Sequence, residues 1–164
     1  MKESTIRKAV GMDLSAINDI YNFYVLNSTC TYQTEPLSLV ERSRWFGDHL
    51  DPYFIRAGEV EGRVVGWASV SRFHPRAAYA KTVEISIYVH HEWQHKGLGK
   101  ALLADLIQCA RVAGFHTLIA AISADQIPSV KLHEKFGFSH GGKINEVGNK
   151  FDRWLDVIYM QLML

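Results

Sequence analysis

Residues 83–100 contain two overlapping patterns that imply different chemistry. Starting at His91 they spell H-E-x-x-H, which in zinc peptidases places two imidazole ligands one helical turn apart beside a glutamate base. Starting at Gln94 they spell Q-x-x-G-x-G. A glycine-rich start of a helix lets an anion such as a pyrophosphate approach the free backbone N–H groups of the first turn. Only one of these two functions can use the segment.

The elements predicted on either side decide between the two patterns. Residues 82–89 alternate polar and apolar side chains as in a half-buried strand, and an apolar helical stripe runs from Leu98 to near Gly114. His91 and His95 therefore fall in the loop between a strand and a helix, and no third zinc ligand follows at a recognisable spacing. The sequence favours the anion-binding pattern, with solvated loop histidines. A zinc peptidase is the less favoured alternative.

Two common phosphate-binding loops do not fit this glycine turn. A P-loop requires G-x-x-x-x-G-K-[ST], and here Ala101 follows Lys100 where a hydroxyl side chain is needed. A dinucleotide-binding turn requires G-x-G-x-x-G/A, and Leu102 occupies its last position, where a small side chain allows close packing. The turn is therefore of another type.

The strand, the turn at residues 94–99 and the Ala/Leu-rich helix together resemble the acetyl-CoA-binding motif of the GNAT superfamily of N-acetyltransferases. Residues 82–89, 129–138 and 150–156 are similar to its phosphinothricin acetyltransferase branch, so the resemblance covers nearly the whole chain. It implies one α/β (α+β) domain over residues 1–164, with a mixed, mostly antiparallel sheet flanked by helices. It also implies direct transfer, in a ternary complex, of the acetyl group of acetyl-CoA to the amine of a small amino-acid-like substrate of phosphinothricin, methionine sulfone or methionine sulfoximine type.

Composition agrees with one domain and limits the partners. The 164 residues, 48% of them hydrophobic, suffice for one core and are too few for two ordinary domains. With 18 basic and 17 acidic residues the chain has no positive field that would favour nucleic acid. Cys30 and Cys109 form at most one disulfide, and no signal peptide or long apolar run is present. We expect a cytoplasmic protein without membrane contact.

Periodicity, caps and turn residues predict the remaining elements in a mixed order of helices and strands. They are a strand near residues 4–7, a helix from about Asp13, a helix opened by the capping box at 38–41 and ending near His49, strands at 53–59 and 63–72 joined through Glu61 and Gly62, a strand at 117–122, a helix at 129–136 stopped by Gly137, and a strand at 154–163. We interpret the irregular residues 73–81 as a substrate loop.

Glu84 is the candidate general base. An amine must lose its proton before it attacks a thioester, and a free α-amino group has a pKa of roughly 7.7 to 8.0, so a nearby base helps. Alternation places Glu84 on one strand face with Ser86 and Tyr88, just before the glycine turn. The alternative is an ordinary carboxylate on a half-exposed strand. The resemblance favours the base, acting directly or through a water.

The resemblance implies the other catalytic groups. Backbone N–H groups around Tyr88 and Val89 would stabilise the oxyanion, and His133 occupies a position where many family members carry a tyrosine proton donor. His133 has the alternatives of a packed helix histidine or a cofactor contact, and Tyr88 is a weaker proton donor candidate. No cysteine lies near the motif, which disfavours an acyl-enzyme.

The cofactor residues also follow from the resemblance, with no metal expected. They are Ile87, Tyr88, Val89, Gln94, His95, Lys96, Gly97, Leu98, Gly99, Lys100, Gln126 and Ser129. Gln126 stands where the family commonly has asparagine, which leaves that contact open.

The substrate contacts predicted from the resemblance are Tyr32, Arg76, Tyr79 and Lys81. Arginine suits a carboxylate or phosphinate, although such residues are also ordinary surface charges, and Tyr32 is alternatively a core aromatic. Enzymes of this kind are often homodimers, and the last strand is a candidate interface. The rival interpretation is a CoA-binding sensor that has the same fold and does not catalyse transfer.

Overall fold

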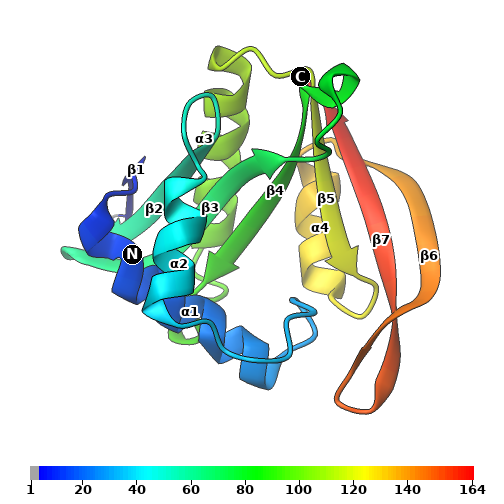
Figure 1. The fold of residues 1–164 in the computed structure, drawn as a ribbon, viewed down its shortest axis with the longest axis horizontal. Coiled ribbons are helices and arrows are strands. Elements are labelled where there is room, and N and C mark those ends of the chain that lie inside the picture. Colours follow the sequence, from blue (N-terminus) through cyan, green and yellow to red (C-terminus); the bar gives the residue numbers. More distant parts are fainter. Residues whose placement is uncertain (1–3) are drawn as a thin grey trace.

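The computed structural model describes residues 4–164 and contains, within that range, a seven-stranded sheet with helices on both faces (Figure 1). The strands are β1 (Ser4–Lys8), β2 (Phe54–Val60), β3 (Arg63–Arg72), β4 (Thr82–Val89), β5 (Thr117–Ser123), β6 (Ser139–Lys150) and β7 (Arg153–Met163). The α-helices are α1 (Leu14–Asn27), α2 (Leu39–Gly47), α3 (Leu98–Val112) and α4 (Ile127–Lys135), and short 3-10 turns occupy Gly11–Asp13, Ala77–Tyr79 and His91–Trp93.

The strand order β1-β2-β3-β4-β5-β7-β6 is antiparallel except between β4 and β5. That parallel pairing starts at Thr82 and Thr117 and ends at Glu84 and Ile119. Beyond these residues β4 and β5 diverge toward their carboxyl ends, as Figure 1 shows. The predicted fold class, a mixed and mostly antiparallel sheet flanked by helices, is confirmed.

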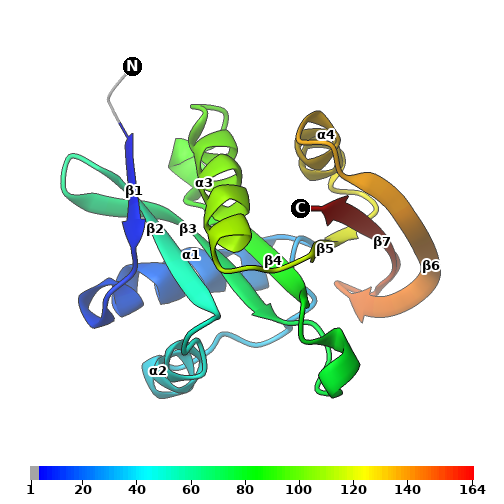
Figure 2. The same ribbon diagram turned by 90° about the horizontal axis from the view of Figure 1, so that it is seen from above.

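Helix α3 packs on one face of the sheet through the apolar stripe that the sequence predicts. Its buried residues are Leu98, Leu102, Leu103, Leu106, Ile107 and Ala110. The helix approaches the sheet closely at Gly58 and Gly66, where an added Cβ would lie 3.0 and 2.9 Å from the Leu98 side chain. Side chains larger than hydrogen at these two positions would push α3 away from β2 and β3. Helix α4 covers the same face, over β5 and β7 (Figure 2).

Helices α1 and α2 cover the opposite face (Figure 2). An aromatic cluster lies between them and the sheet. Trp67 on β3 stacks on Tyr88 on β4 with ring centroids 4.8 Å apart, and Trp45 of α2 meets Trp67 edge-on at 5.3 Å. The buried Arg42 guanidinium lies 4.5 Å from the ring centroids of Tyr21 and Trp45, so aromatic faces rather than a carboxylate surround its charge. This packing fixes the orientation of β4, and with it the strand face that Glu84 shares with Tyr88.

Local signals place several boundaries correctly. The Ser38 hydroxyl accepts from the Glu41 N–H and the Glu41 carboxylate accepts from the Ser38 N–H, which confirms the predicted capping box. The β2–β3 hairpin turns at Glu61 and Gly62, with φ of 50° and 76° as a primed turn requires. The strand β6 lies outside the predicted elements. No helix in the described range is long and apolar enough to cross a membrane.

Candidate active site

The divergence of β4 and β5 opens a cleft of about 1240 Å³. The carboxyl half of β4, the end of β5, the glycine turn, α4 and the end of α1 line it. All of the predicted cofactor residues except Lys96 and Leu98 are among the lining residues, together with His133. Leu98 is instead buried against β2 and β3, and Lys96 places its ammonium 4.6 Å from the ring centroid of Trp93.

The start of α3 has the geometry of an anion site. Gly97 is the N-cap with a φ of 86°, which favours glycine, and no side chain caps the first turn. An added Cβ on Gly97 would meet nothing within 4 Å, so the turn is open on that side. The cleft also contains Lys100 together with Lys131 and Lys135 of α4, three cations suited to phosphate groups. Sequence reasoning missed the two α4 lysines, although their spacing of four on a helix places them on one face.

The H-E-x-x-H pattern is not helical in the way a zinc site needs. His91 lies in the 3-10 turn His91–Trp93, and its ring stacks on Phe23 of α1 with centroids 3.9 Å apart. His95 follows with a φ of 59°. Within residues 4–164 no group of three or more histidine, cysteine, aspartate or glutamate side chains could hold a metal ion. The prediction that these histidines lie before α3 is confirmed.

Glu84 lies at the point where the two strands separate. It is the last β4 residue paired with β5, and its neighbours Ile85 and Ser86 line the cleft while Glu84 itself does not. The side chain is half-buried, and within the described residues the structure gives it no ion-pair partner. Burial therefore raises the pKa of the Glu84 carboxyl above its ordinary value.

His133 is buried on the inner face of α4. Its Nδ1 lies 2.8 Å from the Ser129 carbonyl oxygen, so Nδ1 carries a proton and donates, and Nε2 of the neutral ring is an acceptor. Burial lowers the pKa of His133, which favours this neutral form. The ring of Phe138 meets the imidazole edge-on at 5.0 Å.

Tyr88 and Val89 both line the cleft, but the Tyr88 side chain belongs to the aromatic cluster. Burial raises the pKa of the Tyr88 phenol far above its ordinary value, so it is a poor proton donor to a thiolate. The Val89 carbonyl accepts a hydrogen bond from the hydroxyl of Tyr24, a residue of α1 that sequence reasoning missed. Only the fold shows this partner, because the two residues are distant in sequence.

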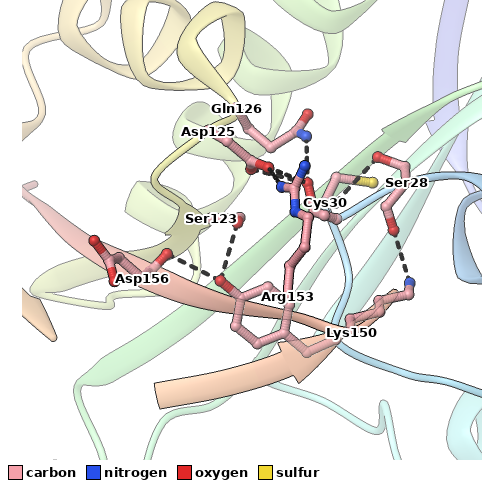
Figure 3. A network of polar contacts seen from close by, with 10 residues as sticks. Ser28, Cys30, Ser123, Asp125, Gln126, Lys150, Arg153 and Asp156 are labelled. Carbon is pink, nitrogen blue, oxygen red and sulfur yellow. Dashed lines mark hydrogen bonds and ion pairs between the residues drawn. The ribbon is translucent and has the colours of Figure 1, made fainter. Parts of the chain in front are cut away.

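Gln126 precedes α4, and its side-chain amide is already engaged. Its Nε2 donates to the Thr29 hydroxyl at 2.9 Å, and the same hydroxyl donates to the Asp125 carboxylate at 2.8 Å. Figure 3 shows Gln126 and Asp125 beside Arg153, which forms an ion pair with Asp125 at 2.9 Å. The Gln126 side chain is therefore tied to the segment after α1, although Gln126 still lines the cleft.

The four predicted substrate residues do not form one group. Arg76, Tyr79 and Lys81 are exposed around the 3-10 turn Ala77–Tyr79 before β4, and none lines the cleft. Tyr79 contacts the ring of His74 at a centroid distance of 4.6 Å.

Tyr32 lies elsewhere, in the connection from α1 to α2. Its hydroxyl lies 2.9 Å from both the Ser123 hydroxyl and the Asp156 carbonyl oxygen. The ring covers Gly148, where an added Cβ would come within 2.5 Å of it.

Cys30 also lines the cleft, so the expectation that no cysteine lies near the motif holds along the sequence and not in the fold. The fold brings the end of α1 to the glycine turn, which spacing along the chain cannot indicate. Burial raises the pKa of the Cys30 thiol, which keeps it protonated and poorly nucleophilic.

Comparison with known proteins agrees with this geometry. The family model described as "Acetyltransferase (GNAT) domain" matches residues 6–159. The chain is 39% identical over 163 residues to an L-methionine sulfoximine/L-methionine sulfone acetyltransferase of Pseudomonas aeruginosa, covering 98% of this chain and 95% of the relative. It is 35% identical over 163 residues to a phosphinothricin N-acetyltransferase of Streptomyces coelicolor, covering 97% and 95%.

Among solved structures, a GNAT superfamily phosphinothricin acetyltransferase from Sinorhizobium meliloti in complex with AcCoA has a TM-score of 0.94 and 39% identity, covering 98% of this chain and 88% of that one. An N-acetyltransferase from Staphylococcus aureus has a TM-score of 0.95 and 40% identity, covering 98% of both chains. The strand, turn and helix that open the cleft are thus those of a known enzyme family, and this chain belongs to the GNAT acetyltransferases.

Proposed function

We propose that this chain is an N-acetyltransferase that moves the acetyl group of acetyl-CoA to the amino group of a small amino-acid-like substrate. Phosphinothricin, methionine sulfone and methionine sulfoximine are the substrates we expect, since relatives that match nearly the full length carry those names. One observation supports the proposal most: a single cleft runs from the uncapped start of α3 to the point where β4 leaves β5 at Glu84.

The described residues fit acetyl-CoA as the cosubstrate. The free N–H groups at Gly97–Gly99 suit a pyrophosphate, and Lys100, Lys131 and Lys135 supply positive charge in the same cleft. Between the diverging strands, we propose that a backbone N–H around Tyr88 and Val89 donates to the oxygen of the thioester carbonyl, and the place of both residues in the lining of the cleft supports this role.

Glu84 is the proposed general base. Its raised pKa makes the carboxylate a better proton acceptor than an ordinary exposed glutamate, and its position where β4 separates from β5 supports this role. Since Glu84 does not itself line the cleft, we propose that a water relays the proton from the amine to the carboxylate.

His133 is proposed as a cofactor contact rather than the proton donor. The bond from Nδ1 to the Ser129 carbonyl leaves Nε2 without a proton, and the lowered pKa disfavours the doubly protonated ring. An acceptor in this position suits an amide N–H of acetyl-CoA.

Arg76 and Lys81 are proposed to bind the acidic group of the substrate. Within the described residues neither side chain has an ion pair, so both charges are available. Tyr79 lies between them in sequence and would pack on the aliphatic part of the substrate.

A homodimer and a cytoplasmic location complete the proposal. The β6–β7 hairpin exposes Ile144, Val147 and Trp154, the last with 65% of its surface accessible, and a second copy would cover such apolar side chains. Cys30 and Cys109 are free thiols, in keeping with a reducing compartment.

Release of free CoA thiol, followed with a panel of amines, tests the function. We expect release that depends on phosphinothricin, methionine sulfone or methionine sulfoximine. Acetyl-CoA binding without release for any amine would instead favour the sensor interpretation. Stoichiometric zinc in protein purified without added metal, lost on His91→Ala, would overturn the assignment in favour of a peptidase.

A further inference from the structure

Residues 24–32, at the end of α1 and just after it, cross the gap between the separated ends of β4 and β5 (Figure 1). At the β4 side the Tyr24 hydroxyl donates to the Val89 carbonyl and accepts from the Gln94 amide, whose nitrogen is 2.7 Å away. One buried hydroxyl therefore holds both the end of β4 and the first residue of the glycine turn.

At the β5 side the same segment has a second anchor. The buried Thr29 hydroxyl donates to the Asp125 carboxylate at 2.8 Å and accepts from Gln126 at 2.9 Å, just after β5 ends. Tyr32 adds a hydroxyl contact to Ser123, the last residue of β5, at 2.9 Å. Residues 24–32 thus contact both strands on either side of the cleft.

The middle of the segment is held by a buried ammonium. Lys150 Nζ donates to the Ser28 carbonyl at 2.7 Å and to the Thr31 carbonyl at 2.8 Å, and it lies 3.4 Å from the Tyr24 carbonyl. Only 4% of the Lys150 surface is accessible, so these three carbonyls replace its water. Because the segment is held at both ends and in the middle, it keeps its two anchor points at a fixed distance.

We propose that residues 24–32 are a brace that fixes the separation of β4 and β5, and that Tyr24 and Thr29 are positioning residues for acetyl-CoA. The identity of the ligand rests on the proposed function. A cleft held open before binding spares the cost of ordering its walls, so the brace strengthens acetyl-CoA binding. Burial raises the pKa of Tyr24 to about 12, so the hydroxyl keeps the proton that it donates to Val89.

The test compares Tyr24→Phe, Thr29→Val and the double variant by calorimetric titration with acetyl-CoA. We expect each single variant to weaken binding by roughly 3- to 10-fold, since each loses two hydrogen bonds of one hydroxyl. The double variant should be weakened by clearly less than the product of the two, because a brace freed at one end no longer holds the other. The KM for acetyl-CoA should rise in step, while kcat and the KM for the amine stay within about twofold.

Tyr53→Phe is the matched control, because its hydroxyl accepts from Arg72 at 3.3 Å outside the cleft and its loss should leave acetyl-CoA binding unchanged. Should Tyr24→Phe not fold, Thr29→Val with Thr29→Ser, which restores the hydroxyl and should restore binding, makes the same test. Three results would overturn the brace. Neither single substitution weakens acetyl-CoA binding, the loss of affinity in the double variant equals the product of the two single losses, or the KM for the amine rises in parallel. Absence of acetyl-CoA binding by the wild-type protein would overturn the proposed function as well, which separates the two failures.

Discussion

The Nδ1 atom of His133 donates to the Ser129 carbonyl oxygen one helical turn earlier, which turns the other ring nitrogen into an acceptor. Without this hydrogen bond, a histidine at a position where many family members carry a tyrosine would be interpreted as a general acid. The helix itself selects the tautomer, because the carbonyl four residues back is within reach of the ring.

His133→Asn tests this tautomer. Asparagine can still donate to the Ser129 carbonyl but lacks the acceptor at the position of Nε2, so the KM for acetyl-CoA should rise by roughly 3- to 10-fold with kcat reduced less than about threefold. Steady-state kinetics at several pH values measures both constants. A fall of about 100-fold in kcat, with loss of the basic limb of the pH–rate profile, would instead identify His133 as the proton donor.

His133 also predicts how stability depends on pH. Its pKa is lowered in the folded state, so the neutral ring contributes stability above the ordinary value of 6.5, and this contribution is lost as pH falls from that value toward the folded-state pKa. The difference in free energy of unfolding between wild type and His133→Asn, measured by urea titration, should therefore shift in favour of the variant below pH 6.5. A difference that is constant from pH 8 to pH 5 would contradict the buried neutral ring.

Glu84→Gln should separate activity from stability. Loss of the base should reduce kcat/KM by about 10²- to 10⁴-fold with acetyl-CoA binding unchanged. The same change removes a half-buried charge for which the described residues supply no ion partner, so the variant should be more stable at neutral pH.

The pH dependence of this difference in stability follows from the raised pKa of Glu84. The protonated carboxyl favours the folded state below the ordinary value of 4.5, and this advantage is lost as pH rises through the higher folded-state pKa. Thermal unfolding at pH 4 and pH 8 checks this, because the stabilisation by glutamine should be present only at the higher pH. Full activity in Glu84→Gln would remove the residue from the mechanism.

Arg76→Gln and Lys81→Gln should affect the amine and not the cofactor. Removal of a charged donor to a carboxylate or phosphinate costs about 1.5–3 kcal/mol, so the KM for an acidic substrate should rise by roughly 10- to 100-fold. The KM for acetyl-CoA should not change. Arg111→Gln, an equal change of charge in the last turn of α3, is the control. Equal effects on an amine that lacks an acidic group would argue against a direct contact.

Patterns of short range predicted most of the elements and the cofactor turn. The alternation of β4, the stripe of α3 and the cap at Ser38 each depend on neighbours within one or two turns, and the structure confirms all three. The strand β6 was not predicted because nearly all of it is exposed, so burial imposes no alternation on its glycines, asparagines and lysines.

The parts of the site that sequence reasoning missed depend on distant pairs. Tyr24 meets Val89 and Thr29 meets Asp125 only because α1 crosses the separated strands, and neither residue type is unusual at its position. Lys150 is a further example. A lysine beside a hairpin turn is expected to be exposed to solvent, whereas here its buried ammonium donates to backbone carbonyls.

Gly148 is where the β6–β7 hairpin depends on having no side chain. An added Cβ would lie 2.5 Å from Tyr32 Cδ2 and 2.6 Å from Cε2, so Gly148→Ala must displace the ring and break its bonds to Ser123 and Asp156. We expect a loss of about 1–3 kcal/mol in free energy of unfolding, measured by urea titration. Gly142→Ala, in the same strand with nothing within 4 Å of the new methyl group, should cost much less.

A second substitution shows whether the Tyr32 ring is the cause. In a Tyr32→Ala background the space above Gly148 is empty, so Gly148→Ala should then cost less than about 0.5 kcal/mol, and the two changes together should cost less than their sum. Strictly additive costs would mean that the strand itself, and not the ring, requires glycine. Because Tyr32 also joins the brace to Ser123, Gly148→Ala should weaken acetyl-CoA binding in the wild-type background and have no further effect once Tyr32 is alanine.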